Sequence, residues 1–366
     1  MTEPSSRIAI YLRLLSGGGA ERMMVNLMQG FVELGLSVDL VLNKADGPYL
    51  DLIPPQVRII DLQSPRMIQG LPKLVSYLKR EKPVAMLTTL HYNIEIAIVA
   101  KLLARANTRL LVREANTLSN QSKYCKTDRW SGRLAKWLYP LADEVLAVSH
   151  GVAEDLSKVT GISTDRIKVV YNPVITPSLL ENSNIAIDHP WLLYKDVPVV
   201  LGVGRLSEQK DFSTLIRAVS QVRQQRPVRL LILGTGPDRE LLRMLASDLG
   251  IKADVEFLGF VKNPYAYMKQ SDVFVLSSKW EGLPNVLIET MAVGTPVIST
   301  RCPSGAVEIL ADGKYGDLVE IGDAQEMAKA ILAVLDGEVK FVEAEWLQQF
   351  TLTSAIEKYL PILLPA

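Results

Sequence analysis

Cysteine and histidine are scarce in this sequence, with two cysteines and three histidines among 366 residues. Because Cys125 and Cys302 lie far apart, the sequence predicts neither a disulfide framework nor a zinc site. No stretch approaches the roughly 18 consecutive apolar residues of a membrane-spanning helix. The start of the chain also lacks the basic segment and apolar run of a signal peptide. We therefore expect a protein of the reducing cytoplasm, either soluble or peripheral on the cytoplasmic face of a membrane.

An excess of either charge is also absent from the whole chain, which has 40 basic and 40 acidic residues. Since no nucleic-acid recognition motif occurs either, a nucleic-acid binder is disfavoured. The charge is nevertheless uneven, because residues 64–136 contain fourteen Lys or Arg and only four acidic residues. This excess predicts an anionic partner for the first half of the chain, or else a solvated basic face.

Short apolar runs rich in β-forming residues alternate with segments of helical spacing along the chain. This alternation predicts an α/β protein with parallel sheets covered by helices on both sides. The predicted strands are Arg7–Leu12, Ser37–Leu42, Val57–Asp61, Val84–Thr88, Arg109–Arg113, Glu144–Val148, Lys168–Tyr171, Pro198–Gly202, Val228–Leu233, Val255–Leu258, Asp272–Leu276 and Pro296–Thr300.

The alternation is interrupted at residues 173–198, which are rich in Pro, Asn and Asp and lack a clear period. We therefore predict two doubly wound, Rossmann-like domains that face each other across a cleft, with ligands at the carboxyl ends of the strands. The domains are expected at residues 1–180 and 181–345. A C-terminal segment, 346–366, is expected to form a helix over Trp346–Leu363 and to pack back on the first domain.

Three glycines, Gly17, Gly18 and Gly19, follow the first predicted strand and open a helix. Glycines at this place let backbone N–H groups approach a phosphate or a sugar at the helix N-terminus. A nicotinamide-dinucleotide site would need a third spaced glycine and an acid after the second strand, and a Walker loop would need Gly-Lys-Ser/Thr. Both patterns are missing, so the segment predicts another phosphate or sugar contact, or only a tight turn.

Two cations, Arg205 and Lys210, lie in the loop after the first strand of the second domain. A diphosphate is well matched by one arginine, which can donate two hydrogen bonds to its oxygens at once, and one lysine, which acts as a point charge. The alternative is a pair of solvated surface charges.

Two glutamates, Glu281 and Glu289, flank the next conspicuous motif, one in a loop and the other on the following helix. Glu289 is placed to accept hydrogen bonds from ribose hydroxyls, and Glu281 to meet a sugar. The alternative is that both acids stabilise a solvent-facing helix N-terminus.

Together these motifs resemble the GT4 family of glycosyltransferases, whose GT-B fold consists of two Rossmann-like domains. The similarity runs nearly end to end and in the family's order. Its segments are GGGAER at 17–22, GVGRLSEQKDF at 202–212, ILGTGPDRELL at 232–242, FLGFVKNP at 257–264 and EGLPNVLIETMAVGTPVIST at 281–300. The motif CPSGAVEIL at 302–310 further resembles members that build bacterial surface glycans or lipid-linked oligosaccharides.

The resemblance implies a retaining, metal-independent hexosyltransferase with no cofactor besides its nucleotide-sugar co-substrate, for which UDP is favoured over GDP. Arg205 and Lys210 are expected to stabilise the diphosphate as it leaves, Glu281 to contact the donor sugar and Glu289 the ribose. The further donor contacts are expected from Gly18, Gly19, Gly234, Gly236, Val261, Leu283, Pro284, Asn285 and Val286.

The first domain is expected to receive the acceptor. Many family members carry a catalytic histidine in one of two loops, often directly after a glutamate, but Ala115 follows Glu114 here. His91, in the other loop, is therefore the candidate catalytic residue, or else a hydrogen-bonded helix cap. Arg113, Glu114 and Asn116 are candidate acceptor contacts, although Arg113 and Glu114 could instead form a structural ion pair.

The expected acceptor is a glycan or a polyprenyl-diphosphate-linked glycan. Anionic membranes attract basic patches by about 1 kcal/mol per cation, which would explain the basic first half. Residues 71–80 join apolar and basic side chains at helical spacing, and Trp130, Lys136, Trp137 and Tyr139 form another mixed stretch. Both suit a helix at the membrane interface, or an ordinary amphipathic helix packed on the sheet.

Other classes of protein share this fold. An epimerase of GT-B shape would lack the paired glutamates and the Arg205–Lys210 loop, and a phosphorylase would need a much longer chain. A catalytically inactive scaffold is disfavoured because both cations and both glutamates are present.

Overall fold

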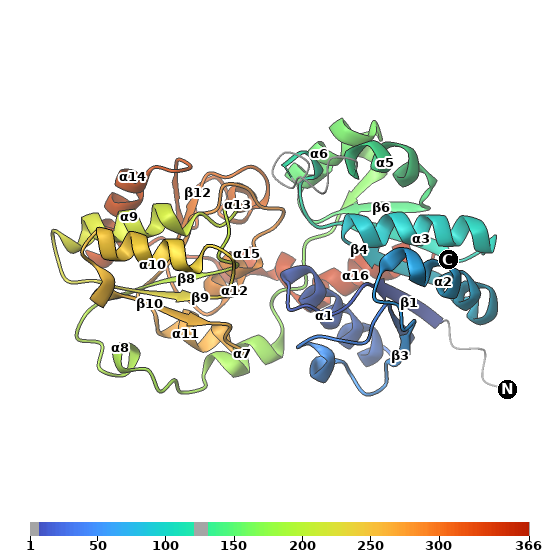
Figure 1. Ribbon diagram of the computed structural model, residues 1–366, viewed down its shortest axis with the longest axis horizontal. Coiled ribbons are helices and arrows are strands. Elements are labelled where there is room, and N and C mark those ends of the chain that lie inside the picture. The colour runs from blue at the N-terminus through green and yellow to red at the C-terminus, as the bar shows by residue number, and fades with distance from the viewer. Residues whose placement is uncertain (1–6, 121–130, 366) are drawn as a thin grey trace. The chain divides into compact units, whose positions relative to one another are not determined.

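The computed structural model describes residues 7–120 and 131–365, the side chains of 131–133 excepted. The chain divides into two compact units, one of Met1–Val174 with Gln349–Ala366 and the other of Ile175–Gln348. Each unit is built on one parallel sheet flanked by helices (Figure 1). The prediction of two doubly wound, Rossmann-like domains is therefore confirmed.

The first domain contains a seven-stranded sheet with the order β3-β2-β1-β4-β5-β6-β7. Its strands are β1 (Arg7–Leu12), β2 (Ser37–Leu42), β3 (Arg58–Asp61), β4 (Ala85–Thr89), β5 (Arg109–Glu114), β6 (Glu144–Ala147) and β7 (Ile167–Val169). Its helices are α1 (Gly19–Glu33), α2 (Met67–Glu81), α3 (His91–Ala104), α5 (Ser131–Leu138), α6 (His150–Thr160) and α16 (Leu352–Leu363), with a 3-10 turn η3 (Tyr139–Leu141). The apolar runs predicted each strand with bounds shifted by no more than two residues.

The last helix of the chain, α16, completes the core of the first domain. Leu352, Ile356 and Tyr359 of α16 are buried in the same cluster as the residues of β1, β2 and α1. Gly30 of α1 permits this approach, because a Cβ at Gly30 would lie 2.7 Å from the Ile356 side chain. Close packing at a glycine therefore holds the C-terminal segment on the first domain.

The single helix predicted over Trp346–Leu363 is wrong. The segment consists of α15 (Ala344–Leu347), a 3-10 turn and α16. Thr351 begins α16 as its N-cap, with extended backbone and a side chain that accepts a hydrogen bond from Ser354 N at 3.2 Å. A capping threonine favours a new helix start, and here the break coincides with the passage of the chain from the second unit to the first.

The second domain contains a six-stranded sheet with the order β10-β9-β8-β11-β12-β13. Its strands are β8 (Val199–Val203), β9 (Arg229–Leu233), β10 (Val255–Gly259), β11 (Val273–Leu276), β12 (Val297–Thr300) and β13 (Asp317–Val319). Its helices are α7 (Pro177–Ser183), α8 (Pro190–Leu193), α9 (Phe212–Arg223), α10 (Arg239–Asp248), α11 (Pro264–Gln270), α12 (Asn285–Ala292), α13 (Gly305–Ile309), α14 (Ala324–Leu335) and α15. The prediction lacked β13, whose three residues are too few to show a period.

The segment 173–198 is not an unstructured linker. It forms α7 and α8, which belong to the second unit. Asn263 Nδ2 donates to Asn182 O at 2.9 Å, and Lys269 Nζ donates to Asn184 Oδ1 at 2.5 Å, so α11 holds the end of α7. The unit boundary accordingly lies at residues 174–175, whereas the predicted boundary at residue 180 falls inside α7.

Candidate active site

The order of strands in the second sheet creates a switch point between β8 and β11, which pair with each other. At such a point the loops after the two strands lead to opposite faces of the sheet and leave a crevice at their carboxyl ends. Arg205 and Lys210 follow β8, and Glu281 follows β11. The topology therefore brings the predicted cations and the first predicted glutamate to one place.

Lys210 and Glu281 form a partly buried ion pair. Lys210 Nζ donates to Glu281 Oε1 at 2.5 Å, and Ser278 Oγ donates to the same oxygen at 2.6 Å. The Lys210 and Glu281 side chains are 16% and 8% exposed. The N-cap of α12 is Pro284, which makes no side-chain cap. Glu281 is thus a partner of Lys210 and not a helix cap.

Arg205 is exposed, in contrast to Lys210. Among the residues that the structure describes, it has no ion-pair partner. Lys210 is held closely, because a Cβ on Gly204 would lie 3.2 Å from carbon atoms of its stem. The loop after β8 therefore presents one anchored point charge and one guanidinium directed to solvent, which is the pairing that suits a diphosphate.

Gly234 and Gly236 let the loop after β9 pack backbone against backbone on the loop after β8. A Cβ on Gly234 would lie 1.9 Å from Gly204 O, and a Cβ on Gly236 would lie 2.1 Å from Leu206 O. Gly234 also has a φ of +130°. The close backbone packing therefore requires glycine at both positions, and it holds the loop that carries Arg205.

The other predicted donor residues lie at neighbouring strand ends. Val261 is half-buried in the loop after β10, beside Phe260, which is 55% exposed. Glu289 is on α12 and 8% exposed. The segment from the loop after β11 into α12 supplies Leu283, Pro284, Asn285 and Val286.

A third loop, after β12, holds the Glu281 loop and was given no role by the sequence. Thr300 Oγ1 donates to Ser278 O at 2.5 Å. Ser304 Oγ and Gly305 N both donate to Gly282 O, at 2.9 and 3.0 Å. The motif at 302–310 indicated the family, but these contacts join residues distant in sequence and no local pattern reports them.

The thiol of Cys302, which follows β12, is close enough to Glu281 and Lys210 for their charges to affect its pKa. Cys302 is fully buried. Burial raises the pKa of its thiol to about 12, Glu281 raises it too, and Lys210 acts in the opposite direction. The thiol is therefore unreactive at neutral pH. Cys125 lies outside the described residues.

In the first domain, the carboxylate of Glu21 lies against Gly18. Ser16 Oγ donates to Glu21 Oε1 at 2.8 Å, which folds Glu21 back over the glycine loop. A Cβ on Gly18 would lie 2.3 Å from Glu21 Oε2. Gly19 is the first residue of α1. Gly17, with a φ of +95°, is the position of this loop where the turn itself favours glycine, and a ligand contact by Gly18 or Gly19 stays a prediction.

His91 begins α3 directly after β4, at the switch point of the first sheet. It is 5% exposed, and its ring lies 3.8 Å from that of Tyr92, centroid to centroid. The N-cap of α3 is Leu90, which has a φ of +70° and makes no side-chain cap. His91 is therefore not the helix cap, and its catalytic role stays a prediction.

Arg113 is enclosed in the first domain, where it is 1% exposed. It donates to Thr89 Oγ1 at 3.0 Å and to Asn172 Oδ1. Among the described side chains its hydrogen-bond partners are neutral, so the proposed ion pair with Glu114 does not form. Arg113 instead ties β4 and β5 to the segment that follows β7.

Glu114 is equally enclosed, at 1% exposure. It accepts hydrogen bonds from Tyr139 Oη at 2.7 Å and from Ala115 N at 3.0 Å. Burial raises the pKa of Glu114 to about 7, against the effect of these bonds. Asn116 is half-buried, and its Oδ1 accepts from Thr117 N at 2.9 Å. Of the three predicted acceptor contacts, only Asn116 retains a partly exposed side chain.

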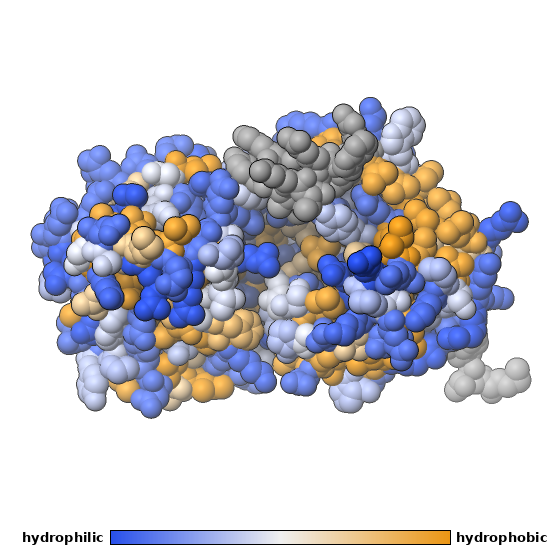
Figure 2. Space-filling model, in the orientation of Figure 1, coloured by the Kyte–Doolittle hydropathy of each residue, from blue (hydrophilic) through white to orange (hydrophobic). Residues whose placement is uncertain are grey.

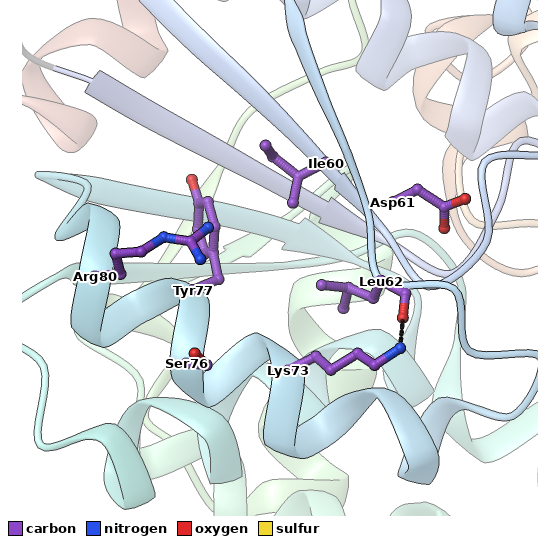
Figure 3. Close-up of a pocket in the computed structure, with 7 residues that line it drawn as sticks. All are labelled: Ile60, Asp61, Leu62, Lys73, Ser76, Tyr77 and Arg80. Carbon is purple, nitrogen blue, oxygen red and sulfur yellow. Dashed lines mark hydrogen bonds between the residues drawn. The ribbon is translucent and has the colours of Figure 1, made fainter.

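A pocket of the first domain is lined by none of the predicted catalytic, donor or acceptor residues, but by four residues of the stretch 71–80. It lies between the end of β3 and α2, where Lys73 Nζ donates to Leu62 O at 2.6 Å (Figure 3). Its lining consists of Ile60, Asp61, Leu62, Lys73, Ser76, Tyr77 and Arg80.

The described residues, 7–120 and 131–365, contain no group of three or more His, Cys, Asp or Glu placed to hold a metal ion. None of their helices is both long and apolar enough to span a membrane.

Two family models match the chain, one in each domain. Residues 17–176 match Glycosyltransferase Family 4, and residues 184–345 match Glycosyl transferases group 1. The chain belongs to the GT4-type glycosyltransferases. The predicted family is confirmed, and Arg205, Lys210 and Glu281 of this glycosyltransferase all lie within the second matched region.

Curated relatives match this glycosyltransferase over most of its length. It is 29% identical to the N-acetylgalactosamine-N,N'-diacetylbacillosaminyl-diphospho-undecaprenol 4-alpha-N-acetylgalactosaminyltransferase of Campylobacter jejuni, over 91% of each chain. It is also 29% identical to the lipopolysaccharide core biosynthesis glycosyltransferase LpsE of Rhizobium meliloti, over 94% of this chain and 96% of that protein.

Solved structures show the same fold. Anabaena Alr3699/HepE in complex with UDP and glucose matches with a TM-score of 0.80 and 22% identity, over 98% of this chain and 99% of that one. WaaG, a glycosyltransferase involved in lipopolysaccharide biosynthesis, matches with a TM-score of 0.74 and 16% identity, over 98% and 100%. This glycosyltransferase therefore has the GT-B fold.

Proposed function

We propose that this glycosyltransferase is a retaining enzyme that transfers a hexose from a UDP-sugar to a glycan or a polyprenyl-diphosphate-linked glycan. The observation that carries the proposal is the Lys210–Glu281 pair at the switch point of the second sheet, with Arg205 on the same loop as Lys210. A sugar nucleotide bound there meets two cations at its diphosphate and a carboxylate at its sugar.

The proposed reaction breaks the bond between the anomeric carbon and the diphosphate oxygen. A bond forms from the anomeric carbon to an acceptor hydroxyl on the same face, and the hydroxyl proton passes to the departing phosphate oxygen. Negative charge grows on the diphosphate as it leaves. Arg205 and Lys210 are already in place to stabilise that charge, which is often the largest contribution to catalysis. Retention is tested by NMR of the product, whose anomeric configuration should match the donor's.

The proposed donor and acceptor are supported by proteins that resemble this chain. The HepE structures contain UDP, UDP with glucose, or UDP-glucose. The name of the Campylobacter relative includes a diphospho-undecaprenol glycan, and LpsE acts in lipopolysaccharide core biosynthesis. We therefore favour UDP as the nucleotide and a glycan on a lipid carrier as the acceptor.

We further propose that the transfer needs no metal ion. The role that a divalent cation plays at a diphosphate is assigned to Arg205 and Lys210, whose charges offset those of the two phosphates. Turnover with the cognate donor should persist in excess EDTA. Complete loss of turnover that Mg²⁺ restores would contradict this part of the proposal.

A membrane surface is proposed as the partner of the first domain. Four leucines and one tryptophan among the described side chains are exposed on α3, α5 and η3, which pack against one another, and Figure 2 shows hydrophobic residues gathered over α3. They are Leu102, Leu103, Leu134, Trp137 and Leu141, which are 46–75% exposed. We call them the α3–α5 surface.

The positive charges near the α3–α5 surface favour an anionic bilayer as its partner. Exposed Lys136 lies on α5 and exposed Arg105 directly follows α3, and the region 64–136 has a large positive excess. Apolar side chains beside cations are typical of interfacial helices. Of the two stretches predicted to bind a membrane, 71–80 packs its apolar residues Leu74 and Tyr77 in the domain interior. In the other, Trp137 is exposed, Tyr139 is buried and Trp130 lies outside the described residues.

A thermal-shift panel of nucleotides and sugar nucleotides tests the proposed donor site. A ligand that binds only the folded state at a hundred times its dissociation constant stabilises it by about 2.7 kcal/mol. We expect a rise in Tm with UDP and its cognate sugar nucleotide, and a smaller rise in Arg205→Ala. A shift with GDP compounds instead would change the proposed nucleotide but keep the proposed site.

The same experiment distinguishes the proposed enzyme from the alternative functions. No shift with any compound at millimolar concentration would favour an inactive scaffold. Epimerisation of the donor without an acceptor would favour an epimerase.

A further inference from the structure

Ser304 has a backbone conformation that glycine normally adopts. Its φ is +82° and its ψ is −146°, in a region where a residue with a Cβ is strained. Such strain persists only where the surrounding structure holds it. A serine offers what a glycine lacks, a hydroxyl, and Ser304 Oγ donates to the carbonyl of Gly282 at 2.9 Å.

The neighbouring Gly305 reinforces this contact. Its N–H donates to the same Gly282 oxygen at 3.0 Å. A Cβ on Gly305 would lie 2.5 Å from that oxygen and 2.8 Å from Leu283 Cα, so the two loops touch along their backbones. One carbonyl next to Glu281 therefore receives two donors from the loop after β12.

Holding the Gly282 carbonyl also sets the direction of the next amide. In a trans peptide the C=O and the following N–H point in opposite directions within one plane, and the described chain contains no cis peptide bond. With Gly282 O directed at Ser304 and Gly305, the Leu283 N–H is directed away from them. Among the described residues, no acceptor binds that N–H. Leu283 belongs to the segment predicted to contact the donor.

We propose that Ser304 is a positioning residue of the donor site. Its hydroxyl, together with the Gly305 amide, holds the Gly282–Leu283 peptide so that the Leu283 N–H is presented to an oxygen of the sugar nucleotide. The strained backbone is the consequence of keeping a hydroxyl at a position shaped for glycine. The proposal rests on the proposed function, because it assigns a role within that donor site.

Two substitutions of Ser304 should separate its effect on stability from its effect on donor binding. Ser304→Gly removes the hydroxyl and relieves the strain, so Tm should stay equal or rise. The Kd and KM for the sugar nucleotide should increase about 3- to 10-fold, the effect of losing one neutral hydrogen bond. Ser304→Thr keeps the hydroxyl but adds a branched side chain at positive φ. Its Tm should fall, while donor Kd below that Tm stays within about twofold of wild type.

The measurements are donor affinity by calorimetry, KM and kcat, and Tm in the absence of nucleotide. Wild-type donor affinity in Ser304→Gly would overturn the proposal and leave Ser304 with a structural role only. Weak binding by Ser304→Thr, to the same degree as Ser304→Gly, would overturn it too. Failure of the proposed function itself looks different, because then the wild-type protein binds no sugar nucleotide at all.

Discussion

The Nζ of Lys210 lies 2.5 Å from the Oε1 of Glu281, although the two residues are 71 positions apart in the chain. The contact joins the loop after β8 to the loop after β11. A cation held in this way has lost its freedom before any ligand binds, so binding of the proposed diphosphate would need less reorganisation of the site. Arg205, on the same loop, is exposed, and Gly234 and Gly236 pack against the backbone on either side of it, at Gly204 and Leu206.

Arg205→Ala should separate catalysis from stability. Arg205 is exposed and its loop is held by Gly234 and Gly236, so Tm should not change. Turnover should fall on the order of 10²–10³, the loss expected for one preorganised charge donor. Steady-state kinetics with the cognate donor measures the effect, and Arg243→Ala, an exposed arginine on α10, is the control. Near-normal turnover in Arg205→Ala would contradict its assignment to the diphosphate.

Lys210→Ala should lower both turnover and Tm, because it leaves the Glu281 carboxylate largely buried without its cation. Adding Glu281→Gln removes that buried charge. The double variant Lys210→Ala/Glu281→Gln should therefore regain Tm and stay as inactive as Lys210→Ala. Restored activity in the double variant would show that Lys210 acts only by neutralising Glu281.

Glu81 should give the first domain a measurable dependence on acid pH. Its hydrogen bond with Arg58, followed by that with Arg80, lowers the pKa of Glu81 from 4.5 to about 2. An acid whose folded-state pKa is lowered stabilises the fold above its unfolded pKa and loses that contribution as pH falls through the folded value. The Tm of wild type should exceed that of Glu81→Gln at pH 6, and the gap should close between pH 4.5 and about 2. Glu357→Gln, at an exposed position of α16, is the control. A gap that is constant with pH would show that the ion pair is not its source.

Trp137→Ser should weaken binding to anionic vesicles. Trp137 is 75% exposed on the α3–α5 surface, and burying even part of an indole in a bilayer interface contributes enough for a roughly tenfold change in partitioning. Cosedimentation with vesicles that contain phosphatidylglycerol at low salt measures it. Phe341→Ser, at an 84% exposed aromatic of the second domain, should leave binding unchanged. Equal binding by both variants would show that the α3–α5 surface is not the membrane-binding site. No binding by the wild-type protein would contradict the membrane proposal as a whole.

Gly30→Ala should destabilise the first domain by separating α16 from α1. The added methyl group would lie 2.7 Å from Ile356, and overpacking of this kind costs about 1–3 kcal/mol. Ile356→Ala removes both atoms that the methyl group would meet at 2.7 Å, Cγ1 and Cδ1, so the double variant should be more stable than the sum of the single effects predicts. Scanning calorimetry of the four proteins measures the coupling. Simple additivity would mean that the two helices do not meet at these residues.

The amino-acid sequence by itself determined the class of fold and the places where chemistry could occur. Strand and helix periods are local, and short apolar runs such as Arg7–Leu12 carry them without help from the rest of the chain. Motifs that directly follow such runs must lie at strand ends, so Arg205, Lys210 and Glu281 could be placed there in advance. Resemblance to a family then supplied expected roles, which local physics alone does not give.

Only the tertiary structure decided which of these residues meet and which are enclosed. The Lys210–Glu281 pair, the burial of Arg113 and Glu114, and the support of Gly282 by Ser304 all join loops that are far apart in sequence. The same holds for the break at Thr351, which a helical period ignores but which lets α16 reach α1. Contacts of this kind depend on the order of strands in each sheet, and that order arises from the packing of the whole domain.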